Sequence, residues 1–356
     1  MQKHAINSIT LYPLRFEPVY QYRLWGGRRL SKLLSAALPD GPVGEAWLLS
    51  DRDDHSSVVA NGQLKGQTLR QIVNQWPTPL LGQSARGPHR FPLLLKLLDV
   101  RTALSVQVHP SDTQTSYLPA GESGKTEAWV VLATGPDSRI YAGLKPNATM
   151  ATIRESLADG VVADQLASFT PTLGDGIFIP AGTVHSLRDL AVFEVQENSD
   201  VTFRLYDWNH VDAKTRQPRA LQVEQALACI DFTQNAIGPV VPVVVEPDPV
   251  LRERLFDCEH FRLWRVRAEA SFTVGADAMP RVLVCIDGEG HVNYGGAAYP
   301  FAKGDVMLLP AAVGACLCHP RGSISLLEIS LPQGACLPPG AAADPAAECE
   351  ALHVKD

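Results

Sequence analysis

Two stretches of the chain, GDGIFIPAGTVH at residues 174–185 and GDVMLLPAAVGA at residues 304–315, align with each other without a gap. Both begin with a Gly-Asp turn, continue as a four-residue apolar strand and reach a proline at the seventh position. Upstream, WVVLATGPDSRIYAG (129–143) aligns with VLVCIDGEGHVNYGG (282–296), and each block reads as a strand, a Gly-containing turn and a second strand. Because the two blocks recur in the same order, the sequence predicts a duplicated β-domain.

Composition supports a mainly β fold. The 356 residues are 46% hydrophobic and 19% charged and include 27 Gly and 27 Pro, which is too apolar for disorder and too rich in turn formers for a helical bundle. Helical patterns are fewer: Thr68 is a candidate cap for LRQIVNQW, Thr149 for MATIRESLADG, and residues 219–230 have helical spacing. We expect these helices to be insertions in the first β-domain.

The chain divides into three predicted regions. Residues 1–235 form the first domain, the Pro-rich segment IGPVVPVVVEPDPV is an extended connector, and residues 250–335 form the second domain. Residues 336–356 have the composition of a flexible tail.

Charge and cysteine content exclude several classes of protein. A net charge of -7 argues against nucleic-acid binding and against binding to anionic membranes, and no run of 18 apolar residues predicts a membrane span. The seven cysteines are an odd number without regular spacing, which favours a reducing compartment. We therefore expect a cytoplasmic protein, and the sequence does not indicate its oligomeric state.

Polar residues gather at three places in the first domain. The segment ALSVQVHP (103–110) alternates strictly and puts Ser105, Gln107 and His109 on one face, while Glu127 begins a later strand. His185 follows a turn fixed by Pro180 and Gly182. Two imidazoles, a carboxylate and an amide oxygen are donors suited to Zn, Fe, Mn or Ni. The sequence therefore predicts a metal site with an open position rather than a structural zinc finger.

The second copy lacks these ligands, because Ala315 aligns with His185 and Pro280 with Glu127. Only the first domain is expected to bind metal. Cys316, Cys318 and His319 have no second ligand pair at zinc-finger distance. The remaining histidines stand alone and receive no role; they are His4, His55, His89, His210, His260, His291 and His353.

Two charged clusters lie close in sequence to the predicted ligands. Lys125 precedes Glu127 by two residues and would share its strand face, and Asp200 and Arg204 would share a face in an extended segment. In a metal pocket the two cations could polarise oxygens or hold a phosphate, and Asp200 could move protons.

The order of motifs resembles the type I mannose-6-phosphate isomerase family in its shorter bacterial form. The resemblance covers roughly residues 11–330, and its carriers are PLRFEPVYQYRLWGG (13–27), GEAWLLSD (44–51), NGQLKGQTL (61–69), FPLLLKLLDVRTALSVQVHPSD (91–112), GKTEAWVVL (124–132), GDGIFIPAGTVHSL (174–187) and ENSDVTFRLYDWN (197–209).

The resemblance implies a pair of jelly-roll-like cupin β-barrels and one Zn²⁺ per chain held by Gln107, His109, Glu127 and His185. It also implies Arg204, Lys125 and Asp200 as active-site residues. The implied reaction is the interconversion of mannose 6-phosphate and fructose 6-phosphate through an enediol. Lys96 and Arg204 are possible contacts for the substrate phosphate.

Two other functions are compatible with the sequence. The first is a metal-dependent cupin enzyme that oxidises or epimerises another sugar, and the second is a sugar-phosphate-binding regulator without turnover. Retention of Lys125, Asp200 and Arg204 beside the ligands argues against the regulator, because binding alone does not require all three.

Overall fold

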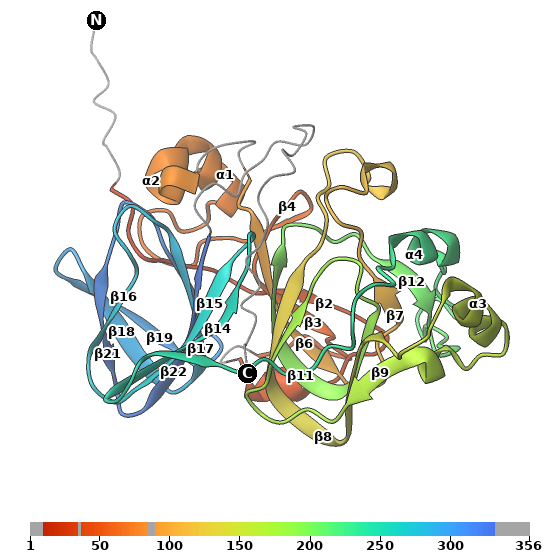
Figure 1. Ribbon diagram of the computed structural model, residues 1–356. Coiled ribbons are helices and arrows are strands. Elements are labelled where there is room, and N and C mark those ends of the chain that lie inside the picture. The colour runs from red at the N-terminus through yellow and green to blue at the C-terminus, as the bar shows by residue number, and fades with distance from the viewer. Residues whose placement is uncertain (1–9, 35–36, 85–89, 332–356) are drawn as a thin grey trace, which may run out of the picture.

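The computed structural model describes residues 10–34, 37–84 and 90–331, and β-strands dominate them (Figure 1). The prediction of a mainly β fold is confirmed. The predicted tail at 336–356, with Cys336 and Cys349, lies outside the described residues.

One sheet is built from nine strands within the described residues. Its main path runs β10-β8-β11-β6-β3-β2; β7 pairs with β11 and β12, and β9 pairs with β8. These strands are β2 (Val19–Gln21), β3 (Glu45–Leu49), β6 (Leu93–Val100), β7 (Val106–Val108), β8 (Glu127–Leu144), β9 (Leu166–Phe169), β10 (Gly176–Ile179), β11 (His185–Glu197) and β12 (Phe203–Tyr206).

The C-terminal part of the described chain folds into two further sheets, on the left in Figure 1. The larger has the order β1-β20-β17-β22-β15-β14-β13 and consists of β1 (Leu14–Arg15), β13 (Val243–Glu246), β14 (Val250–Asp257), β15 (Arg262–Ala268), β17 (Arg281–Asp287), β20 (Val306–Leu309) and β22 (Ile324–Ser330). The smaller has the order β16-β21-β18-β19 and consists of β16 (Phe272–Val274), β18 (Glu289–Tyr294), β19 (Ala297–Ala302) and β21 (Cys316–Pro320). A separate ribbon pairs β4 (Asp51–Arg52) with β5 (His55–Ser56).

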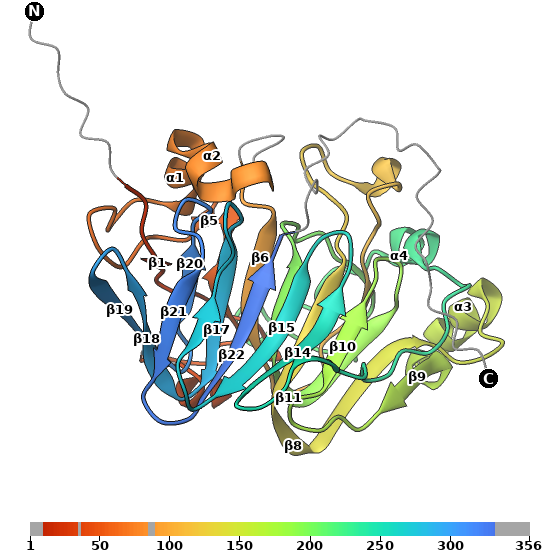
Figure 2. The same ribbon diagram turned by 60° about the vertical axis from the view of Figure 1, so that its left-hand side comes forward.

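Helices in the described residues are short and lie outside the sheets (Figures 1 and 2). Thr68 and Thr149 each close a capping box, as their sequence positions predict, whereas the helix expected over 219–230 begins only at Val223. The α-helices are α1 (Leu69–Gln75), α2 (Pro77–Leu81), α3 (Met150–Ala158) and α4 (Val223–Cys229), and the 3-10 helices are η1 (Arg29–Lys32), η2 (Gly82–Ser84), η3 (Thr115–Tyr117) and η4 (Val162–Gln165).

The nine-stranded sheet is buried on both faces. Along β8, Ala128 and Val130 belong to a large core that also contains Leu263 and Val282 of the second sheet. Trp129 and Val131 point the other way, into the inner core of the first sheet. Since side chains alternate along a strand, Glu127 lies on the inner face with Trp129, as the sequence predicts.

The N-terminal part of the chain also contacts the second copy. Strand β1 pairs with β20, and the carbonyls of Pro79 and Leu80 in α2 accept hydrogen bonds from Ala312 and Ala311. The division into domains at 1–235 and 250–335 stays a prediction.

Strand pairing corrects the upstream half of the repeat alignment by one residue. Ile179 pairs with Glu127 in the first copy, and the aligned residue Leu309 pairs with Arg281. Arg281, and not Pro280, therefore occupies the position of Glu127. Residues 129–143 also lie within the single strand β8, without the expected turn, whereas in the second copy a turn at Gly288 separates β17 from β18. A register shift between Arg188 and Leu190 lets β8 remain paired with β11.

Candidate active site

Three of the four predicted ligands converge in the structure. His109 follows β7, Glu127 begins β8 and His185 begins β11, and one ligand atom of each lies within 4.8 Å of the other two. Nε2 of His109 is 3.5 Å from Oε2 of Glu127, and Nε2 of His185 is 3.4 Å from Oε1. All three side chains are buried. The turn before His185 forms as expected, with Gly182 at a φ of 86° that favours glycine.

Backbone carbonyls fix the orientation of both imidazoles. Nδ1 of His109 lies 2.8 Å from the carbonyl oxygen of Val201, and Nδ1 of His185 lies 2.9 Å from that of Thr183. Because a carbonyl oxygen only accepts hydrogen bonds, each Nδ1 carries the proton and donates it. Each Nε2 is left with a lone pair and lies beside Glu127, where Lys125 contacts Nε2 of His109 and the Gln107 amide contacts Nε2 of His185.

Electrostatics favour the protonation states in which these residues bind a cation. Burial lowers the pKa of His185 to about 3 against the opposing charge of Glu127, and burial and Lys125 lower the pKa of His109. Burial alone would raise the pKa of Glu127, but Lys125 and the imidazoles outweigh it and hold this pKa well below its usual range. The cluster therefore contains two neutral imidazoles and one carboxylate at neutral pH.

The fourth predicted ligand, Gln107, lies beside His185. Its Nε2 is 3.1 Å from Nε2 of His185, and the backbones of the two residues are paired between β7 and β11. A 180° rotation of the side-chain amide exchanges its nitrogen and oxygen, so Gln107 can present oxygen to a cation at this position.

Lys125 contacts the cluster directly. Its Nζ is 3.2 Å from Nε2 of His109 and also forms an ion pair with Glu127. The structure therefore brings Lys125 together with the predicted ligands, as the two-residue spacing indicated.

Asp200 and Arg204 contact residues next to the cluster rather than the cluster itself. Asp200 lies 3.5 Å from Lys96, and its pKa is lowered because Lys96 and Lys125 outweigh the effect of burial. Arg204 pairs with Gln107 through its strand, and its buried Nε has no hydrogen-bond partner among the described residues. Burial and the nearby Arg219 lower the pKa of Arg204.

Sequence reasoning missed two of the acidic residues near Lys96, Glu194 and Glu45. The Lys96 ammonium is 3.4 Å from Glu194 and lies over the ring of Trp47. Glu194 also accepts a hydrogen bond from the indole N–H of Trp129. The attraction of Glu194, Asp200 and Glu45 outweighs burial and raises the pKa of Lys96. The sequence pattern that could have identified Lys96 and Glu194 is a single charged residue inside an apolar run, in LLLKLL and in AVFEV.

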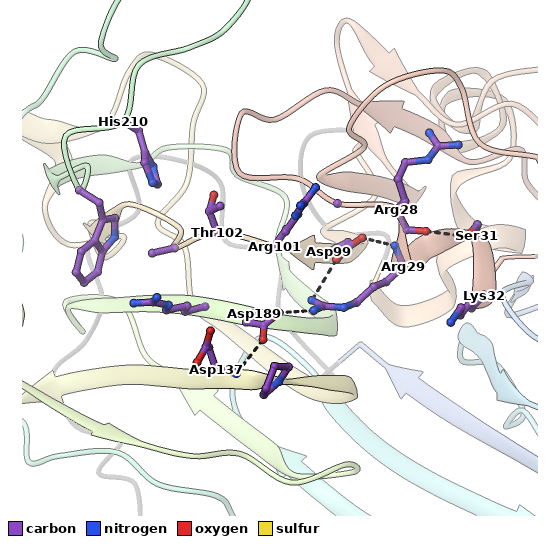
Figure 3. Close-up of a pocket in the computed structure, with 15 residues that line it drawn as sticks. Arg28, Arg29, Ser31, Lys32, Asp99, Arg101, Thr102, Asp137, Asp189 and His210 are labelled. Carbon is purple, nitrogen blue, oxygen red and sulfur yellow. Dashed lines mark hydrogen bonds and ion pairs between the residues drawn. The ribbon is translucent and has the colours of Figure 1, made fainter.

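A cavity of about 910 Å³ lies elsewhere, and none of the predicted site residues lines it. In Figure 3 the side chains of Arg28, Arg101 and Lys32 point in different directions, and Arg29 is engaged with Asp99 and Asp189. The basic groups do not converge on a common point, so we assign this cavity no chemistry.

No helix in the described parts of the chain is long and apolar enough to cross a membrane. The five described cysteines, Cys229, Cys258, Cys285, Cys316 and Cys318, are free thiols, and the last two are buried in the core of the second copy.

Comparison with known proteins gives concordant matches. Residues 13–128 match the family described as phosphomannose isomerase type I, catalytic domain, and residues 256–324 match the mannose-6-phosphate isomerase cupin domain. The chain is 34% identical over 322 residues to mannose-6-phosphate isomerase ManA of Bacillus subtilis, covering 86% of this chain and 95% of the relative. It is 30% identical over 302 residues to mannose-6-phosphate isomerase of Streptococcus mutans, covering 85% and 93%.

A solved structure is also similar. The mannose 6-phosphate isomerase from Bacillus subtilis superposes with a TM-score of 0.82 at 27% identity and covers 89% of this chain and 99% of that one. The sequence motifs, the two β-units and the buried His-Glu-His cluster agree with these matches, and the chain belongs to the type I mannose-6-phosphate isomerase family of cupin enzymes.

Proposed function

We propose that this chain interconverts mannose 6-phosphate and fructose 6-phosphate through an enediol, as a zinc-dependent enzyme of the cytoplasm. The observation that carries the proposal is the buried cluster of His109, Glu127 and His185 with Lys125 against it, in a member of this family.

The donor set fits a divalent cation. Among the described residues Oε1 of Glu127 is buried without a hydrogen-bond partner, and both Nε2 atoms face the same carboxylate, where a cation could replace their contacts with Lys125 and Gln107. An unpartnered buried carboxylate oxygen is costly unless a cation compensates it. His109, Glu127, His185 and Gln107 would hold zinc, which prefers nitrogen and oxygen donors of this kind. When bound, zinc supplies positive charge that polarises the oxygens of the substrate.

Lys125 and Arg204 contribute fixed positive charge. Negative charge develops on the carbonyl oxygen as the proton leaves C2 of the sugar, and a cation in a buried site stabilises that charge strongly. Lys125 is placed for this role by its contacts with His109 and Glu127. The unpartnered Nε of Arg204 makes this residue a donor to an anionic oxygen of the substrate or of its phosphate.

Asp200 is our first candidate for moving the proton between C2 and C1. Its lowered pKa keeps the carboxylate ionised at neutral pH, so it can accept a proton, and its side chain is 42% exposed and reachable by substrate. Lys96, held between Glu194 and Asp200, orients this carboxylate and is a second cation for the phosphate.

A coupled assay with mannose 6-phosphate tests the proposal. Activity should fall on chelation in proportion to lost metal and return when zinc is added back. Turnover in D₂O should place deuterium on C1 of fructose 6-phosphate, because the proton of an enediol intermediate exchanges with solvent. No turnover by zinc-loaded protein would refute the isomerase, and oxygen consumption would favour the alternative cupin oxidation.

A further inference from the structure

A second group of donors lies where the second sheet meets the first. Asp112, Glu197 and His260 each offer one ligand atom, and these atoms lie within 4.8 Å of one another. Asp112 follows β7, Glu197 ends β11, and His260 lies in the turn between β14 and β15. The sequence assigned no role to His260, because its two partners are distant along the chain.

Backbone groups orient both carboxylates from one short segment. The backbone N–H of Gly124 donates to Asp112 at 2.7 Å, and the backbone N–H of Thr126 donates to Oε2 of Glu197 at 2.6 Å. Oε1 of Glu197 is 3.4 Å from Nδ1 of His260, and Nε2 of the same imidazole is 3.3 Å from Glu259. A carboxylate behind an imidazole is the usual outer support of a metal-binding histidine.

The carboxylates of Asp112 and Glu197 are not paired with a basic side chain of the described Lys and Arg residues. Among the described residues, no Lys or Arg forms an ion pair with Asp112 or Glu197. Glu197 is 6% exposed. A carboxylate buried without a cation is unfavourable, so the arrangement gains from an added one.

We propose that Asp112, Glu197 and His260 form a second divalent-cation site, suited to Zn²⁺, that joins the second sheet to the active-site segment. Two carboxylates and one imidazole are a mixed oxygen and nitrogen donor set of the kind zinc accepts, with an exposed side left for water. The ion would link the β14–β15 turn, through His260, to Asp112 in the loop after His109 and to Glu197 at the end of β11, just before Asp200.

Metal counting tests the proposal without relying on turnover. Chelator-treated full-length protein is dialysed against buffered micromolar Zn²⁺, and bound zinc per chain is measured by elemental mass spectrometry. We expect two ions in the unsubstituted chain, one in His260→Ala and one in Asp112→Asn. Asp112 is exposed, so folding of that variant is not at issue. His291→Ala, the same substitution elsewhere in the second copy, should keep two ions.

The outcomes separate this site from the catalytic one. His185→Ala should keep the ion at Asp112, Glu197 and His260. One ion in the unsubstituted chain that is lost in His260→Ala but kept in His185→Ala supports this site and counts against the catalytic metal. An equal zinc content in the unsubstituted chain, His260→Ala and Asp112→Asn overturns the proposal.

Discussion

The two copies of the β-unit share a backbone frame and differ in the side chains that it presents. Gly174 and Gly304 adopt φ values of 87° and 89°. The aspartates that follow them each accept a hydrogen bond from the backbone N–H three residues earlier, at 2.8 Å for Asp175 and 2.9 Å for Asp305. The Gly-Asp turn is thus retained for backbone reasons alone, whether or not a site lies beside it.

The two copies differ in the charged residues that lie on the inner face of the sheet. Register places Glu328 where the first copy has Glu194, because Leu283 and Trp129 are equivalent partners on the neighbouring strands. Arg281 replaces Glu127, and its Nε lies 3.6 Å from Glu328. At the position of Glu127 the second copy therefore has a cation, whereas the first has a carboxylate that is paired with Lys125 and lies beside two neutral imidazoles, a donor set that can hold a metal.

Making the first copy resemble the second should have the largest effect. His185→Ala gives the first copy the alanine that the second copy has at the aligned position, Ala315. It removes one Nε2 donor and should abolish metal binding at the His-Glu-His cluster. We expect kcat/KM to fall at least ~10³-fold, because a metal supplies several kcal/mol of charge stabilisation. Steady-state kinetics with zinc analysis checks this, and retained activity would contradict the metal assignment.

Arg204→Ala should separate chemistry from metal binding. The predicted ligands are untouched, so zinc content should stay unchanged while kcat/KM falls by about 10²–10³-fold through the loss of one charge-stabilising donor. Arg139→Ala, at an exposed position of β8, is the matched control and should leave both quantities unchanged. An Arg204→Ala enzyme with normal kinetics would exclude this residue from the active site.

Arg281→Ala should affect the second copy only. Its side chain is 12% exposed and that of Glu328 is 3% exposed, so the substitution removes one of the two arginines paired with a buried carboxylate and leaves Arg252 as the other. We expect the free energy of unfolding to fall by about 2 kcal/mol while kcat is retained. Chemical denaturation measures the difference, with Arg321→Ala as an exposed control. A loss of turnover in folded Arg281→Ala would show that the second copy takes part in catalysis.

Cys285→Ala should have the smallest effect. Burial raises the pKa of the Cys285 thiol to about 12, so the folded thiol stays neutral where an unfolded one ionises. Stability should therefore fall as pH rises from about 9 to about 12, and less steeply in the variant. At pH 7 the substitution should cost about 1 kcal/mol without loss of rate. Rapid alkylation of Cys285 in native protein at pH 8 would contradict this account.

Local patterns allowed much of the fold to be predicted. Thr68 and Thr149 open helices because each cap depends on residues within four positions. His185 could be placed because Pro180 and Gly182 form the turn just before it. The helix at 219–230 starts late because Gln222 donates its backbone N–H to Arg204, a contact 18 residues away in sequence.

Contacts between residues that are distant in the sequence could not be predicted from local patterns. Both faces of the first sheet are buried, so alternation alone does not show that Lys96 and Glu194 lie on the inner face. Arg281 was misplaced by one position because sequence alignment does not fix strand register. The contact of His260 with Glu197 depends on how the two sheets pack together.

Zinc titration of metal-free protein, with isomerase activity followed at each addition, tests most directly whether the first copy holds the catalytic metal. We predict no activity without metal and full recovery with the equivalent that fills His109, Glu127 and His185, with no recovery in His185→Ala. Full turnover of mannose 6-phosphate by protein shown to be metal-free would contradict the account.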